Sequence, residues 1–339
     1  MSACRWSVRC APRFFPILVI QPPSMNRYPL VFFLLIFLIQ CKPSPDKQES
    51  SLKDSSLRPA AAPASPAKTY DYCYVNRKGV FVFKTGDSPG TRINLPGVRP
   101  KLSPDGAFLA FTYQVAPDYE RRIGLMVLTT LKTSLVDSAC HNCYGPVWSP
   151  NGKYLAYNAM IGLQWNIKIV DLRSGKASFI PLDTGKFGNF SPQWSGDSKK
   201  IVVQDMTNVY LIDLNGNTLR TININSIDSG VGVGSSANFL INGKEDKLIC
   251  DCELSTDSMG LEGGPPPHLL AYDLDAKKMI NLQPNGYICF DPVLKDDTVF
   301  STGYRSKGKG RMNIYRIDLT GGNFRLAYKD CEDFSCRTR

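Results

Sequence analysis

The sequence predicts an all-β fold made of repeated four-stranded antiparallel sheets. A turn motif, YGPVWSPNGKYLAY (residues 144–157), recurs as VRPKLSPDGAFLAF (98–111) and as NFSPQWSGDSKKIVV (189–203). A proline ahead of each turn repeats every 46 residues, at Pro100, Pro146 and Pro192. A period of about 40 to 50 residues indicates an array of structural repeats.

Each unit begins with a strand that contains this proline and ends in a tight turn. In SPDG (103–106) and SPNG (149–152), proline presets φ at the first corner and Asp or Asn suits the second. Glycine takes the position that needs a positive φ. The apolar runs FLAF (108–111) and YLAY (154–157) that follow have strand length, so each unit reads as a small antiparallel meander.

A further strand of each unit ends in Asp-Leu and another turn. Clear copies have their aspartates at Asp171, Asp213, Asp273 and Asp318. Weaker equivalents are GVFVFKTGD (79–87) and GLMVLTTLK (124–132), which brings the number of copies to six. Because these aspartates stand at strand ends beside turn residues, we interpret them as turn caps rather than as catalytic acids or bases.

The count of strands predicts how the array closes. Beside the three proline strands there is one at Pro292 and a degenerate copy around Asn242, which makes five. The repeats start in mid-unit at YDYCYVN (70–76) and end with a surplus segment, NFRLAYKDCEDFSC (323–336). We therefore predict a six-bladed β-propeller over residues 70–339, closed by the C-terminal strand. Closure of the ring leaves no open sheet edge.

The repeated P-x-W-S-P-D/N-G-K-x-L-A-Y and I-x-D-L-x-x-G motifs resemble the propeller repeat of the TolB family, the periplasmic component of the Tol–Pal system. They are also similar to propellers of prolyl-oligopeptidase-type peptidases, but the sequence has no G-x-S-x-G nucleophile elbow. TolB carries an α/β domain ahead of its propeller, where we expect only a linker here. The resemblance implies a non-catalytic propeller whose partner is a cell-envelope protein.

The N-terminal part predicts export and a lipid anchor. Residues 1–41 read as a leader, with Met25 as a better start, an apolar run at 30–39 and Cys41. LIQC (38–41) resembles the bacterial lipobox, which implies lipidation of Cys41; an uncleaved membrane anchor is the alternative. Residues 42–69, rich in Pro, Ser and Ala, read as a disordered linker. We expect a monomeric lipoprotein of the outer membrane, facing the periplasm or the cell surface.

Eight cysteines follow Cys41, and an even number in an exported chain favours disulfides. The candidates are Cys140, Cys143, Cys289, Cys331 and Cys336. A Cys331–Cys336 link would pin the segment that closes the ring. For Cys250 and Cys252, which share one face of a strand, separate partners or buried free thiols are expected.

Metal binding and catalysis have weaker support. Cys140, His141 and Cys143 are ligand-type residues, but a second matching pair is missing, so we predict no metal and no cofactor. The sequence holds two histidines, His141 and His268. Trp148 and Trp194 fall at equivalent repeat positions and should be core residues.

Partner contacts are expected in a long insertion and at one hairpin. The insertion spans residues 253–268 and contains Met259, Leu261 and His268. Trp165 lies at a hairpin between two strands and is a candidate contact residue, with packing in the core as the favoured alternative. The net charge of +10 is modest, and the basic run 305–311 reads as a solvated hairpin tip. Export argues against a nucleic-acid partner. The sequence thus favours a binding scaffold; the alternative is a sensor or enzyme with a glycan or peptide in the central channel.

Overall fold

The computed structural model describes residues 69–87, 90–115, 120–179, 188, 190–228, 230–254, 265–307 and 310–337. The chain divides into two units, 1–54 and 55–339, and all described residues belong to the second. Within them the one helix is a short 3-10 turn, η1 (Ile224–Ser226), and no helix is long and apolar enough to cross a membrane. Cys41, Met259, Leu261 and the predicted leader and linker up to residue 68 lie outside the described residues.

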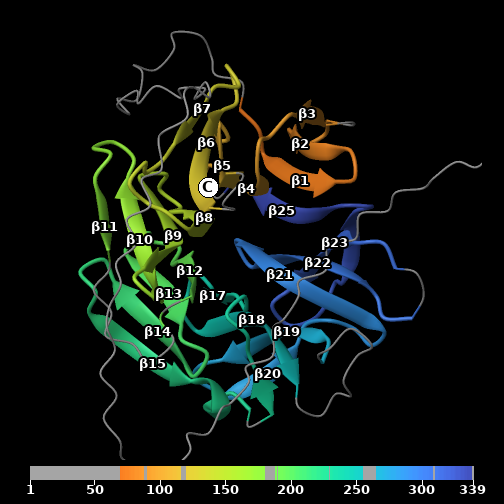
Figure 1. Cartoon of the computed structure of the whole chain (residues 1–339). Helices are drawn as coiled ribbons and strands as arrows, with labels where there is room; N and C mark the ends of the chain where they lie inside the picture. The colour runs from red at the N-terminus through yellow and green to blue at the C-terminus, as the bar shows by residue number, and fades with distance from the viewer. Residues whose placement is uncertain are drawn as a thin grey trace, which may run out of the picture. The chain divides into compact units, whose positions relative to one another are not determined.

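Six antiparallel sheets stand in a ring around a common centre (Figure 1). From the innermost strand outward, the first two blades are β25 (Glu332–Cys336), β1 (Tyr72–Asn76), β2 (Gly79–Phe83) and β3 (Thr91–Ile93), then β4 (Val98–Leu102), β5 (Phe108–Val115), β6 (Glu120–Val127) and β7 (Thr133–Leu135). The third and fourth are β8 (Cys143–Trp148), β9 (Tyr154–Ile161), β10 (Gln164–Asp171) and β11 (Ala177–Phe179), then β12 (Phe190–Trp194), β13 (Lys200–Gln204), β14 (Asn208–Asp213) and β15 (Thr218–Asn223).

The fifth and sixth blades complete the ring. The fifth contains β16 (Val231–Gly232) and β17 (Phe239–Ile241), then β18 (Lys247–Leu254), β19 (Pro267–Asp273) and β20 (Lys278–Asn281); the sixth contains β21 (Tyr287–Lys295), β22 (Thr298–Arg305), β23 (Asn313–Asp318) and β24 (Arg325–Tyr328). The inner strand of the fifth blade is split in two, and both pieces pair with β18. This is the degenerate repeat, which lacks the proline of the other copies.

The predicted closure is confirmed. β25, the last strand of the chain, pairs antiparallel with β1, the first, so the two ends of the described chain meet in one blade. Phe334 of β25 is 3% exposed and its ring stacks on those of Tyr72, Phe300 and Tyr328, at centroid distances of 5.8, 4.9 and 5.5 Å. The C-terminal strand therefore contributes to the cores of the first and the sixth blades.

The aspartates at strand ends cap turns, as predicted. Oδ1 of Asp213 accepts the N–H groups of Asn215 and Asn217, both at 2.9 Å. Asp171, Asp273 and Asp318 accept N–H groups of their own turns in the same way. These carboxylates already have partners in their turns, which explains why they recur at fixed places in the repeat.

The turns between the first two strands of each blade also follow the predicted chemistry. Gly106 and Gly152 have φ values of 73° and 69°. Ser198 and Glu245, which stand where two other copies lack this glycine, adopt the same left-handed conformation, with φ of 61° and 59°. The turn backbone is therefore kept while its residue type varies.

Two equivalent glycines allow a matched test of this geometry. A methyl group at Gly106 would overlap the carbonyl oxygen of Tyr70, whereas at Gly152 it would meet only Cδ of Pro104, at 4.0 Å. Gly152→Ala should cost about 1 kcal/mol of the free energy of unfolding, from its positive φ alone. Gly106→Ala should cost roughly 2 kcal/mol more because of the overlap. Urea denaturation of both variants measures the difference, and equal losses would contradict the predicted clash.

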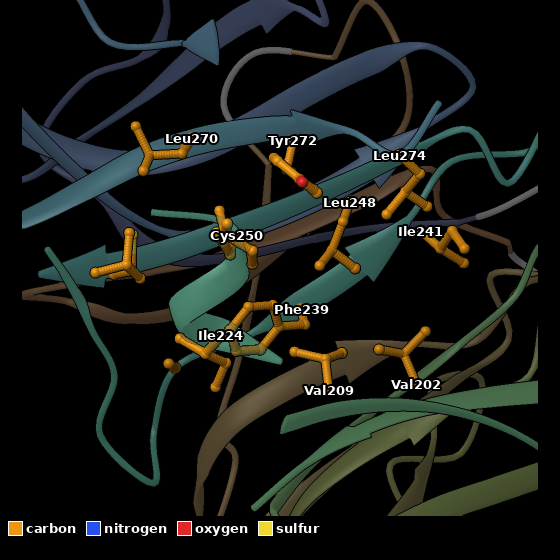
Figure 2. Close-up of a cluster of buried hydrophobic side chains, with 14 of the residues drawn as sticks. Val202, Val209, Ile224, Phe239, Ile241, Leu248, Cys250, Leu270, Tyr272 and Leu274 are labelled. Carbon is orange, nitrogen blue, oxygen red and sulfur yellow. The ribbon is translucent and has the colours of Figure 1, made fainter. Parts of the chain in front are cut away.

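The core lies between neighbouring blades. Figure 2 shows the contact between the fourth and fifth, where Val202 and Val209 face Phe239, Leu248 and Cys250. Cys250 is fully buried among apolar side chains and carries a free thiol. The tryptophans of the repeat tie inner strands together. Nε1–H of Trp148 donates to the carbonyl of Lys101 in the preceding blade at 2.9 Å, and that of Trp194 to Val147 at 3.2 Å.

Candidate functional site

The inner strands of the propeller enclose a central cavity of about 380 Å³. Its lining includes Arg99, Tyr144, Ser191, Asp291 and Asp333, which come from five different blades. A volume of this size falls within the range of small-ligand sites, roughly 300 to 1,000 Å³. The cavity and its mouth are therefore the candidate site.

A backbone irregularity recurs along the cavity wall. One residue of the inner strand has a positive φ in five blades, and these residues are Arg99, Gly145, Ser191, Asp291 and Asp333. The pairing of each inner strand shifts register there, as in a β-bulge. In four of the five cases the next residue is the repeat proline, which has no N–H to lose from the ladder. The bulge exposes backbone N–H groups that must find other partners.

A ring of buried polar side chains meets this need. They occupy the same position in the second strand of successive blades, and they are Thr112, Asn158, Gln204, Asp251 and Thr302. Each of three of them accepts an N–H from a bulge in the next blade. Oγ1 of Thr112 binds Gly145 N at 3.1 Å, Oδ1 of Asn158 binds Ser191 N at 3.1 Å, and Oδ2 of Asp251 binds Asp291 N at 2.8 Å.

The other two members differ. Gln204 is fully buried and donates from Nε2 to the carbonyl of Gly234 at 3.0 Å, in the irregular inner segment of the fifth blade. Oγ1 of Thr302 is buried and has no hydrogen-bond partner among the described residues. The sequence carried a signal for this ring that was missed. A polar residue follows the apolar run in each copy, as in FLAF-T, YLAY-N, IVV-Q and LIC-D.

Asp251 is the ionisable member of the ring. It is 8% exposed, and its Oδ1 also accepts the N–H of Asn238 at 2.6 Å, so the carboxyl group joins the inner strands of the fifth and sixth blades. Burial raises the pKa of Asp251 to about 7. The two N–H donors favour the ionised form and lower the pKa, but their effect is smaller than that of burial. Burial likewise raises the pKa values of Glu332 and Asp333. Of these carboxyl groups Asp333 lines the cavity, together with Asp291 from the sixth blade.

The cavity mouth between the second and third blades is basic and aromatic. The guanidinium group of Arg121 lies over the ring of Tyr144, 4.4 Å from its centroid, and 5.3 Å from the ring of Trp165. The rings of Tyr144 and Trp165 meet edge to face at 4.9 Å. Trp165, predicted as a contact residue, is half-buried at the start of β10. It follows the hairpin tip where Leu163 is 97% exposed.

The other predicted contact residue lies elsewhere. His268 is half-buried on β19, beside Cys252 of β18, and its Nδ1 is 3.4 Å from Nε2 of Gln283. Gln283 also accepts the N–H groups of Leu269 and Cys289 through Oε1. His268 therefore belongs to a junction between the fifth and sixth blades, and the structure does not bring it together with Trp165.

The structure joins one of the predicted cysteine sets. Cys140 and Cys143 form a disulfide in the segment that leads into β8. Cys289, Cys331 and Cys336 are buried free thiols, so the predicted Cys331–Cys336 link is wrong. β25 is extended between the two residues, which separates their Cα atoms by more than about 10 Å, beyond the reach of a disulfide. Burial raises the pKa values of Cys289 and Cys331 to about 12, which keeps both as thiols.

Comparisons with known proteins agree with this architecture. No family model matches the chain. The chain is 31% identical over 86 residues to the Tol-Pal system protein TolB of Francisella tularensis subsp. mediasiatica (strain FSC147). That match covers 24% of the chain and only 19% of the curated relative.

Among solved structures, the chain resembles TolB from Acinetobacter baumannii, with a TM-score of 0.55 and 15% identity over 79% of this chain and 66% of that one. It also resembles a putative TolB from Agrobacterium tumefaciens, with a TM-score of 0.51 and 13% identity over 77% and 89%. The fold and cavity thus define a closed six-bladed β-propeller. The propeller is TolB-like.

Proposed function

We propose that this protein is a non-catalytic binding scaffold of the bacterial cell envelope, whose partner is another envelope protein. The observation that carries the proposal is the cavity mouth between the second and third blades. There an exposed apolar tip, Leu163, adjoins the Trp165–Tyr144 pair and the Arg121 guanidinium. Aromatic residues and arginine are the side chains enriched at the centres of protein interfaces.

The likeness to TolB supports the cellular setting. The TolB relatives are named as Tol-Pal system proteins, and we extend an envelope role to this chain by that likeness. A lipid anchor at Cys41 with the 42–69 linker would tether a monomeric propeller to the outer membrane. The partner would then be met in the periplasm or at the cell surface.

Site-specific photo-crosslinking in cells tests the scaffold. A photoreactive amino acid at position 163 should capture one dominant envelope protein. The same residue at position 219 serves as the control, because Leu219 is also exposed, at 54%, but lies on β15, the outermost strand of the fourth blade. Equal capture at both positions, or none at position 163, would rule out an interface at this mouth.

The second candidate is a small glycan or peptide held in the cavity. The volume of about 380 Å³ and the mixed polar and aromatic lining favour it. Such a ligand would protect the inner strands β4, β8 and β12 from hydrogen exchange and leave the tip at Leu163 unchanged. A protein partner would protect the tip.

A further inference from the structure

Arg121 is held in one orientation at the cavity mouth. Its Nε and Nη2 donate to Oδ1 of Asn142 at 3.1 and 2.8 Å, and the plane of the guanidinium group lies over Tyr144. The side chain of Asn142, just before β8, also donates from Nδ2 to Sδ of Met160 at 3.4 Å. Among the described residues, no hydrogen bond uses Nη1 of Arg121. The side chain is therefore preorganised and keeps donors for another group.

A second arginine shares this place. Arg99 is exposed on the β4 bulge and lines the cavity together with Tyr144. Burial, and then repulsion from Arg99, lowers the pKa of Arg121, although an arginine remains charged in a protein. Both arginines also oppose the burial effect that raises the pKa of Tyr144. One like charge thus lies over the Tyr144 ring, and a second lines the same cavity.

Within the described parts of the chain, no carboxylate lies within 4.0 Å of Arg99 or Arg121. Glu120, the acid next to Arg121 in sequence, is bound instead to Nη2 of Arg122 at 3.2 Å and to Nδ1 of His141 at 3.0 Å. Asp333 lies on β25 of the neighbouring first blade, where Lys101 and then Arg99 lower its pKa against burial, and among the described residues no ion pair joins it to Arg99.

We propose that Arg99 and Arg121 form a binding site for one oxyanion, a carboxylate or a phosphate group, at the cavity mouth. Guanidinium groups donate paired, planar N–H groups that match these anions. The acidic side chains Asp291 and Asp333 line the same cavity, so a ligand with a single anionic group fits better than a polyanion. This site rests on the proposed function, because the envelope partner would supply the anion. The partner would place one acidic group between the two arginines.

Trp165 provides a local signal for a test with the full-length protein in detergent. Sodium acetate and sodium phosphate are titrated at constant ionic strength against chloride, and tryptophan fluorescence is compared with that of Trp165→Phe, which removes the signal. The wild type should show a saturable change. Arg121→Gln and Arg99→Gln should each raise the apparent Kd about tenfold or more, as expected when a charged hydrogen bond is lost. Arg173→Gln, at an exposed turn of the third blade, should bind as the wild type does.

The outcomes separate the two proposals. A response to phosphate alone points to a phosphorylated group, and a response to acetate as well points to a carboxylate. No saturable change with either anion, or glutamine variants that respond as Arg173→Gln does, would overturn the oxyanion site. Because Arg99 is exposed, its variant tests the site even if Arg121→Gln folds poorly. Crosslinking at position 163 without anion binding would support the scaffold and contradict the oxyanion site. Anion binding without crosslinking would support the oxyanion site and contradict the scaffold.

Discussion

Replacing Phe334 by alanine should lower the free energy of unfolding by about 3–5 kcal/mol, as expected for a fully packed aromatic residue. Phe334 lies on β25, is 3% exposed and stacks on rings from the first and sixth blades. The loss therefore falls on the strand that closes the ring. Urea denaturation measures it, and hydrogen exchange should show faster opening of β25 and β1 than of β9.

The control is Leu326→Ala on β24, the outermost strand of the sixth blade, where the side chain is 45% exposed. It should cost less than about 1 kcal/mol, as an exposed position does. If Phe334→Ala proved as mild as Leu326→Ala, closure by β25 would not be a major contribution to stability.

The stability of the wild-type protein should fall as the pH rises from about 4 to about 7, because of Asp251. Its pKa is about 7 in the folded protein and about 3.9 in an unfolded chain, so the folded state holds the proton over this interval. The two pKa values differ by about three units, which corresponds to a total change of about 4 kcal/mol in the free energy of unfolding. Below and above this pH window the contribution of Asp251 to stability no longer changes with pH. Chemical denaturation at a series of pH values measures the slope.

Asp251→Asn removes this titration. The variant should be less stable than the wild type near pH 4.5, because an amide N–H₂ faces one of the two N–H donors of Asn238 and Asp291. Near pH 8 the difference should shrink or reverse, because the variant buries no charge. Glu332 and Asp333 also have raised pKa values, so the difference between the variant and the wild type is the quantity to follow. Parallel pH profiles would show that Asp251 does not titrate in this window.

Most of the fold could be predicted from the sequence repeat. The spacing of Pro100, Pro146 and Pro192 predicted the blades, and the surplus C-terminal segment predicted the closing strand. The aspartate caps were predictable because a turn uses its own side chain, a few residues away along the chain. The positive φ of Gly106 and Gly152 was predictable for the same local reason.

The candidate site was less predictable because its contacts join different blades. Asn158 and Ser191 are 33 residues apart, and nothing local indicates that one accepts the N–H of the other. The positive φ of Arg99 is set by the bulge rather than by residue type. Register alone suggested a Cys331–Cys336 bond, but the extended strand between the two residues forbids it.

The position of β1 has a mechanical consequence. Its neighbours are β25 on one side and β2 on the other, and the preceding Asp71 is held by Arg337 through an ion pair of 2.7 Å. If residues before Thr69 tether the propeller to a membrane, tension enters the domain through this strand. Hydrogen bonds in an antiparallel ladder run across the strand, so a pull along β1 loads both ladders in shear, many bonds at once. The blade that closes the ring would then also be the one that bears the load of the tether.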